Sequence, residues 1–220
     1  MILLGDMEPA KPLHRVLERI VDRVWWIPGN HDADSDELWH HVWDSELAHR
    51  NLHGKVVTLP DGTRIAGLGG VFREAVWYPT AAAARAGAPA FPSAARHGAV
   101  TPRQDRWQGE GPHRRHWGTI YPDVFEALAD EQADVLVTHE APGYHPHGFE
   151  LLDALAQAMG VSITVHGHQH DALDSSGRWT EQGFRSFGVG LRGLTVLDKY
   201  GTAQIIKPGE LDAQRQTRQD

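Results

Sequence analysis

Short apolar runs that stop at polar clusters are the feature that most constrains the fold of this chain. Residues 1–4 form the first run and end at a Gly-Asp pair, and residues 24–28 form the second. Between the two runs, leucine, isoleucine and valine recur at helical spacing over residues 13–21. A strand, helix, strand order predicts a parallel pair with a right-handed crossover, which places both strand ends at one edge of a sheet.

The same pattern returns in the second half of the chain. Apolar runs at residues 134–138 and 162–165 each end at histidines. Helices are expected over residues 36–47, 121–130 and 149–158, and a hairpin over residues 55–68 around an Asp-Gly turn. Short strands are expected to complete a second sheet at residues 184–189, 194–197 and 203–206. The sequence therefore predicts an α/β fold in which four strand ends meet.

Composition excludes several classes of protein. The 220 residues, 40% of them hydrophobic, fit one globular domain. A formal charge of -8 argues against bulk binding of nucleic acid, and the lack of cysteine excludes disulfides, thiolate metal sites and cysteine nucleophiles. No apolar run approaches the roughly 18 residues of a membrane helix. We therefore expect a cytoplasmic protein without a membrane partner.

The polar residues at the strand ends are ligand types for divalent cations. The chain has 15 histidines, and several of them follow the apolar runs. The candidates at the four strand ends are Asp6, Asn30, His31, Asp32, His139, His168 and His170. Nitrogen and oxygen donors of this kind favour manganese, iron or zinc. The sequence thus predicts a metal site at the shared edge.

These blocks occur in a characteristic order: Gly-Asp, Gly-Asn-His-Asp, a lone histidine after a strand, and Gly-His-x-His. In this order the sequence resembles the calcineurin-like metallophosphoesterases. The resemblance implies two packed mixed β-sheets flanked by helices, a four-layer α/β/β/α sandwich, in one domain over residues 1–220. It also implies a divalent-metal-dependent phosphoester hydrolase, a phosphatase or phosphodiesterase for which manganese is a candidate metal.

The resemblance also implies a role for each residue of the site. Asp6 would bridge two metal ions, while Asn30, His139 and His168 would complete one ion's ligands and His170 would bind the other. A metal-bound hydroxide would attack phosphorus. His31 would stabilise the charge or protonate the leaving oxygen, and Asp32 would orient His31.

One block of the family pattern does not occur in this sequence. The family begins with an Asp-x-His pair at the end of an initial strand, and nothing before Met1 provides it. We therefore expect the first strand to be missing and one metal site to be half-built. Three explanations stay open: a truncated or mis-assigned start, one tight metal with one weak metal, and a catalytically silent relative.

Residues 78–118 interrupt the pattern and read as a long insertion loop. The segment has six arginines against Asp105 and Glu110, a formal charge of +4. It is either a solvated loop or a cap whose Arg114 and Arg115 bind substrate phosphate. A mobile tail is expected from about residue 207.

Alternatives to the hydrolase assignment follow from the same residues. A binding or scaffold protein would not need His31, and a hydrolase of a non-phosphate bond would not need the arginines. The sequence does not choose among a phosphorylated small molecule, a nucleotide and a phosphoprotein as substrate, and it leaves the oligomeric state open. Glu140 is expected to be a solvated acid, and surface histidines are expected at His40, His41, His145 and His147.

Overall fold

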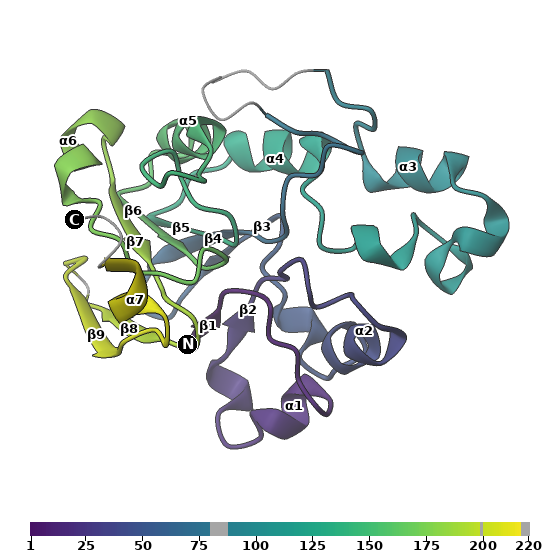
Figure 1. The fold of residues 1–220 in the computed structure, drawn as a ribbon, viewed down its shortest axis with the longest axis horizontal. Coiled ribbons are helices and arrows are strands. Elements are labelled where there is room, and N and C mark those ends of the chain that lie inside the picture. The colour runs from purple at the N-terminus through teal and green to yellow at the C-terminus, as the bar shows by residue number, and fades with distance from the viewer. Residues whose placement is uncertain (80–87, 199, 217–220) are drawn as a thin grey trace.

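A five-stranded sheet lies at the centre of the structure, a computed structural model that describes residues 1–79, 88–198 and 200–216 (Figure 1). Its strands, in spatial order, are β3 (Lys55–Thr58), β4 (Arg64–Leu68), β5 (Val135–Thr138), β6 (Ile163–His166) and β7 (Arg185–Gly188). The β3–β4 pair is antiparallel and forms the predicted hairpin. The other three pairs are parallel. The sheet is therefore mixed, and its parallel strands deliver their carboxyl ends to one edge.

A second, parallel pair of strands packs on this sheet. It consists of β1 (Ile2–Leu3) and β2 (Trp25–Trp26). Side chains alternate between the two faces of a strand. Trp25 packs in a cluster with Val137 of the five-stranded sheet, whereas Trp26 packs in a cluster on the opposite face. The pair is thus covered on both sides.

Helices cover the two outer faces (Figure 1). On the β1–β2 side, α1 (Leu13–Val16) and α2 (Asp36–Trp43) bury apolar residues against Trp26. On the far side of the main sheet, α4 (Pro122–Ala129) and α5 (Glu150–Ala158) contribute to the largest core cluster. Two helical layers therefore enclose two sheet layers, and the predicted fold class is confirmed.

The first helix is shorter than its apolar periodicity predicts. The helix expected over residues 13–21 ends after one turn, and the chain continues to a 3₁₀ turn, η1 (Val21–Arg23). No side chain caps its first turn. Single-turn helices have little stability of their own, so packing of Leu13 and Leu17 on Trp26 decides the local path.

The predicted second sheet of residues 184–189, 194–197 and 203–206 is wrong for its first strand, β7 (Arg185–Gly188). Strand β7 pairs with β6 in the main sheet, where Thr164 donates its hydroxyl proton to the Ser186 hydroxyl at 3.0 Å. The last two strands, β8 (Leu194–Leu197) and β9 (Ala203–Lys207), form a separate antiparallel hairpin. The parallel partner of β6 could not be identified from apolar periodicity, because β7 is short and half polar.

The described part of the 78–118 segment contains regular structure that composition did not predict. Helix α3 (Ala94–Val100) begins at Ser93, whose hydroxyl accepts a hydrogen bond from the Arg96 N–H at 3.1 Å. Residues 80–87, which include much of the Ala-rich stretch, lie outside the described residues. Three 3₁₀ turns follow: η3 (Arg103–Asp105), η4 (Trp107–Gly109) and η5 (Arg114–His116).

Four tryptophans attach the insertion to the body of the protein. Trp107 and Trp117 of the insertion contact Trp39 of α2 edge to face, with ring centroids 5.5 and 5.0 Å apart. Trp43 stacks on Trp39 and also meets Trp117. Trp39 and Trp43 of α2 therefore pack against the insertion as well as the core.

The remaining elements are short. They are the 3₁₀ turns η2 (Ala48–Arg50) and η6 (Ser176–Arg178) and the helices α6 (Trp179–Gln182) and α7 (Asp212–Gln216). Helix α7 lies in the segment for which the sequence predicts a mobile tail. Among the described residues, no helix combines the length and the apolar character needed to cross a membrane.

Candidate metal centre

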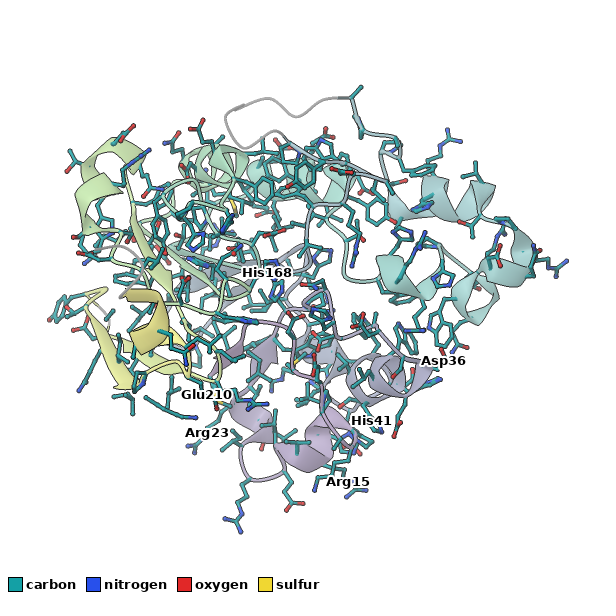
Figure 2. All side chains as sticks on the ribbon, viewed as in Figure 1. Arg15, Arg23, Asp36, His41, His168 and Glu210 are labelled. Carbon is teal, nitrogen blue, oxygen red and sulfur yellow. The ribbon has the colours of Figure 1, made fainter. Side chains whose placement is uncertain are left out.

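Four strand ends converge where the two sheets meet. Asp6 follows β1, Asn30 follows β2, His139 follows β5 directly, and His168 follows β6. Figure 2 shows His168 at the centre of the molecule, between the strands and the helical layer of α2. The parallel pairing of β1 with β2 and of β5 with β6 places all four residues at the same edge.

The side chains at these ends lie within contact distance of one another. Nε2 of His139 is 3.3 Å from Oδ2 of Asp6 and 3.2 Å from Oδ1 of Asn30. Nδ1 of His168 is 4.0 Å from Oδ2 of Asp6. One ligand atom from each of Asp6, His139 and His168 lies within 4.8 Å of the other two, a spacing that one metal ion can bridge.

The proton positions on the two histidines suit metal binding. Nδ1 of His139 is 2.6 Å from the backbone oxygen of Leu4. A carbonyl only accepts, so Nδ1 carries the proton and Nε2 presents a lone pair to the group. Nδ1 of His168 is buried without a hydrogen-bond partner among the described residues. A metal ion would satisfy that nitrogen, so the residues present fit the group that the donor set implies.

The Asp6 carboxylate stays ionised in this environment. Burial acts to raise the pKa of Asp6, but the nearby imidazoles of His139 and His168 and the backbone N–H of His31 outweigh burial and hold the pKa well below its ordinary value. Its other oxygen, Oδ1, accepts the backbone N–H of His31 at 2.8 Å. One carboxylate oxygen is therefore fixed by the backbone, and the other faces the histidines.

The backbone at the site adopts unusual conformations. Asp6, His168 and His170 have φ angles of 50°, 61° and 62°. Residues other than glycine rarely adopt positive φ, and such positions cluster at functional sites. The strain at these three predicted ligands argues that the loops are shaped to place their side chains.

Two glycines allow the loops to approach closely. A Cβ at Gly29 would lie 2.1 Å from Oδ1 of Asp6, and a Cβ at Gly5 would lie 2.5 Å from Nδ1 of His139. Gly5 also has a φ of 91°. Any larger residue at either position would displace a ligand.

His31 lies at the exposed rim of the group. Its side chain is 51% exposed, and Nδ1 is 2.6 Å from Oδ2 of Asp34. The hydrogen bond to Asp34 raises the pKa of His31 above its ordinary value. The proton-bearing form is therefore favoured next to the metal group.

Asp32 does not have the contacts predicted for it. The carboxylate is fully buried and accepts backbone N–H groups of Asp6 at 3.0 Å, Met7 at 2.7 Å and Gly29 at 2.8 Å. It ties the loops after β1 and β2 together. Orienting His31 falls to Asp34 instead, because the Asp32 side chain is committed to the backbone below the site.

His170 does not join the metal group in this structure. Among the described residues, the group within 4.8 Å contains Asp6, His139 and His168 alone. His170 lies in the same loop as His168, and its backbone oxygen is 3.4 Å from the N–H of Leu191. Its assignment to a second metal ion stays a prediction.

Both arginines of the insertion pair make protein contacts. Nε of Arg114 is 2.8 Å from Oδ1 of Asp36, and the same guanidinium donates to the backbone oxygen of Ala33. Nε of Arg115 donates to Nε2 of His116 at 3.2 Å. Arg114 thus joins the insertion to the first turn of α2, and its binding of substrate phosphate stays a prediction.

One acid that sequence reasoning placed in solvent lies in the site. Glu140 is 4% exposed, and its Oε2 is 3.8 Å from Nε2 of His168. Burial raises the pKa of Glu140 to about 7. The sequence signal that could have placed Glu140 in the site is its position directly after His139, because the chain stays buried beyond β5.

His145 is a second correction. His40 and His147 are exposed as predicted, but His145 is 4% exposed. Its Nε2 is 3.3 Å from Oδ1 of Asp171, a buried acid beside the last histidine block. The pairing joins loops far apart in sequence, which a single sequence does not reveal.

Comparison with known proteins agrees with this geometry. The sequence profile of the calcineurin-like phosphoesterase family matches residues 2–172. An uncharacterised protein of Haemophilus influenzae is 38% identical over 192 residues, which cover 84% of this chain and 80% of that protein. The crystal structure of TT1561 of Thermus thermophilus is similar in fold, with a TM-score of 0.56 and 17% identity over 94% of this chain and 84% of that one.

Proposed function

Because the chain belongs to the calcineurin-like phosphoesterase family, which implies metal-dependent hydrolysis of phosphoesters in general, we propose that it hydrolyses phosphate esters at the group of Asp6, Asn30, His139 and His168. One observation carries the proposal: the unpartnered buried Nδ1 of His168 lies in the same ligand group as Nε2 of His139, whose lone pair is exposed by the bond to Leu4. A divalent cation bound there would lower the pKa of a water molecule and neutralise charge on the phosphoryl oxygens.

The side chains around the metal group have different roles in the proposed reaction. Oδ2 of Asp6 and the two histidine nitrogens would hold the cation, and Oδ1 of Asp6 keeps the loop of His31 in place. His31, which Asp34 keeps protonated, donates a proton to the leaving oxygen. Oε2 of Glu140 lies 3.8 Å from Nε2 of His168, and its charge favours a proton on that nitrogen, which would leave Nδ1 for the cation.

The ligand atoms limit which metal ions the site can favour. Imidazole nitrogen with carboxylate and amide oxygen suits manganese, iron or zinc better than magnesium or calcium. We assign the first ion to the four residues above and a second ion to Asp6 and His170. The number of metal ions bound per chain tests the assignment of two sites. A chain with only one competent site binds a single ion tightly.

The test is metal-stimulated hydrolysis of chromogenic substrates. p-Nitrophenyl phosphate and bis(p-nitrophenyl) phosphate are offered to the full chain with manganese, iron or zinc, beside titration of each metal by calorimetry. His168→Ala should lose metal binding and turnover together. His31→Ala should keep metal binding and lose most turnover. His49→Ala, an exposed histidine of η2, is the matched control and should keep both.

The outcomes separate the alternatives. Turnover that is lost in His31→Ala supports the hydrolase. The ratio of the monoester rate to the diester rate then shows which of the two esters the enzyme prefers, and this preference limits the candidates among small molecules, nucleotides and phosphoproteins. Metal binding without turnover of either ester would favour a binding protein. Turnover unchanged in His168→Ala would contradict the assigned site.

A further inference from the structure

Arg73 projects from a segment that lies directly beside the metal centre. The N–H of Gly70 donates to the Pro28 oxygen at 2.6 Å, just before Asn30. Two residues later, the backbone N–H of Phe72 stabilises the Glu140 carboxylate, which contacts His168. Arg73 is the next residue, so its Cα is anchored between two of the strand ends that form the site.

Within the described part of the chain, one side-chain hydrogen bond positions the guanidinium of Arg73. Its Nε donates to the Thr119 hydroxyl oxygen at 3.0 Å. Thr119 follows Gly118, whose Cα lies so close to the second strand end that a Cβ there would be 2.2 Å from the Gly29 oxygen. The contact through Nε fixes the plane of the guanidinium and leaves its two terminal nitrogens for another acceptor.

A second cationic side chain, that of Arg115, lies near enough to act on the charge of Arg73. Burial, and after it the charge of Arg115, lowers the pKa of Arg73, while the charges of Asp34 and Glu140 act in the opposite direction. Among the residues that the structure describes, no carboxylate lies within 4.0 Å of a nitrogen of either guanidinium, whereas Arg114 beside them has its partner in Asp36. Asp34 and Glu140 act on Arg73 from beyond ion-pair distance. Two cations that no carboxylate contacts directly form a site that an anion stabilises.

We propose that Arg73, with Arg115 beside it, is the phosphate-binding residue of this site and holds the phosphoryl oxygens that do not react. The inference rests on the proposed function for its substrate, and it replaces the Arg114–Arg115 pair of the insertion with a pair that spans the body and the insertion. The ligand class is the dianion of inorganic phosphate or of a phosphate monoester. Arg114 has no part in it, because its guanidinium is engaged with Asp36 and Ala33.

Equilibrium binding of inorganic phosphate tests this assignment without turnover. Calorimetry is carried out on the full chain, both metal-free and loaded with manganese, for wild type, Arg73→Gln and Arg73→Lys. Arg178→Gln is the matched control, because Arg178 forms an exposed ion pair with Glu181 away from the strand ends. We expect Arg73→Gln to weaken phosphate binding by about tenfold or more, since it removes a charge-assisted pair of hydrogen bonds. Arg73→Lys should recover part of the loss, because it keeps the charge but not the planar fork.

Kinetics then separate this inference from the proposed function. With p-nitrophenyl phosphate, Arg73→Gln should raise KM by a similar factor and leave the affinity for manganese unchanged. If no variant turns over substrate but phosphate binding still depends on Arg73, the anion site stands and the hydrolase fails. If wild type turns over substrate and Arg73→Gln and Arg73→Lys bind phosphate as wild type does, the anion site is overturned and the hydrolase stands. A thermal melt of each variant identifies a folding defect, in which case the milder Arg73→Lys decides.

Discussion

The buried carboxylate of Asp32 accepts a hydrogen bond from the backbone N–H of Asp6 at 3.0 Å, although 26 residues separate them in sequence. The same carboxylate binds the N–H of Gly29 at 2.8 Å. The loops after β1 and β2 are therefore held by one buried acid, which contacts the backbone of Asp6 and Gly29 and not the side-chain atoms of the metal group. Because Asp6 provides the central carboxylate of the group, the position of the metal ligands depends on a residue below them.

Asp32→Asn should destabilise the protein and weaken metal binding together. An amide offers one acceptor oxygen and an NH₂ group that cannot accept, so some backbone N–H groups would be left unsatisfied in a dry site. We expect a loss of about 3 kcal/mol in the free energy of unfolding and weaker binding of manganese. Urea denaturation and metal titration by calorimetry measure the two effects.

The control for this change is Asp22→Asn, which alters an exposed acid of η1. It should change neither the free energy of unfolding nor the affinity for manganese. An Asp32→Asn protein with wild-type stability and metal affinity would show that the backbone contacts of Asp32 do not hold the site together. Stability lost without any loss of metal affinity would confine Asp32 to the fold.

Gly29→Ala should displace Asp6 from the metal group. The new Cβ would lie 2.1 Å from Oδ1 and 2.4 Å from the backbone nitrogen of Asp6, so the loop after β1 must move. Overpacking of this kind costs about 1–3 kcal/mol. The free energy of metal binding should change more than the free energy of unfolding, because the side chain that moves is a proposed metal ligand.

Gly177→Ala is the matched change, since a Cβ at Gly177 meets nothing within 4 Å and the residue lies in η6. Thermal melts and manganese titrations of both variants check the prediction. Equal metal affinity in the two proteins would mean that the loop after β1 tolerates the shift.

Arg114→Gln should loosen the insertion. Arg114 joins η5 to α2 through Asp36 and stacks over the ring of Trp107, with Cζ 5.4 Å from the ring centroid. We expect a loss of about 1 kcal/mol in stability and a change in tryptophan emission. The KM for p-nitrophenyl phosphate should stay near that of wild type, because Arg114 is occupied by α2. A large rise in KM with unchanged emission would restore Arg114 to the role of a phosphate ligand.

The sequence predicted the parts of the fold whose signal is local. Apolar runs placed β5 and β6, and the Asp-Gly turn placed the β3–β4 hairpin. Because parallel strands carry their loops to one edge, the same runs indicated that Asp6, Asn30, His139 and His168 would meet. The partners of these side chains were less visible, since each contact joins segments far apart in the chain.

Asp32 and Asp34 show why the roles within the site could not be assigned from spacing. Both acids lie within three residues of His31, and composition gives no reason to prefer either. Asp32 turns inward because the backbone N–H groups of two loops need a buried acceptor, while Asp34 stays at the rim beside the imidazole. Only the direction of each side chain distinguishes the acid that binds the backbone from the acid that binds His31.

The pairing of His31 with Asp34 should set the alkaline limit of activity. Asp34 raises the pKa of His31, and in the proposed function the protonated form of His31 donates a proton to the leaving oxygen. Activity therefore falls as pH rises through the pKa of His31. Asp34→Asn removes the cause of the shift and returns that pKa toward about 6.5, so the alkaline limb of the kcat/KM profile should move to lower pH.

Asp44→Asn tests whether this shift is specific to His31, because Asp44 forms the same kind of exposed pair with His40 at 2.5 Å on α2. That variant should keep the wild-type profile, measured with p-nitrophenyl phosphate at saturating manganese between about pH 5 and pH 9, the range in which a histidine titrates. If the limb stays in place in Asp34→Asn, the group that limits activity at high pH is not His31. If the limb moves to higher pH, the sign of the Asp34 effect is reversed and His31 acts in its neutral form.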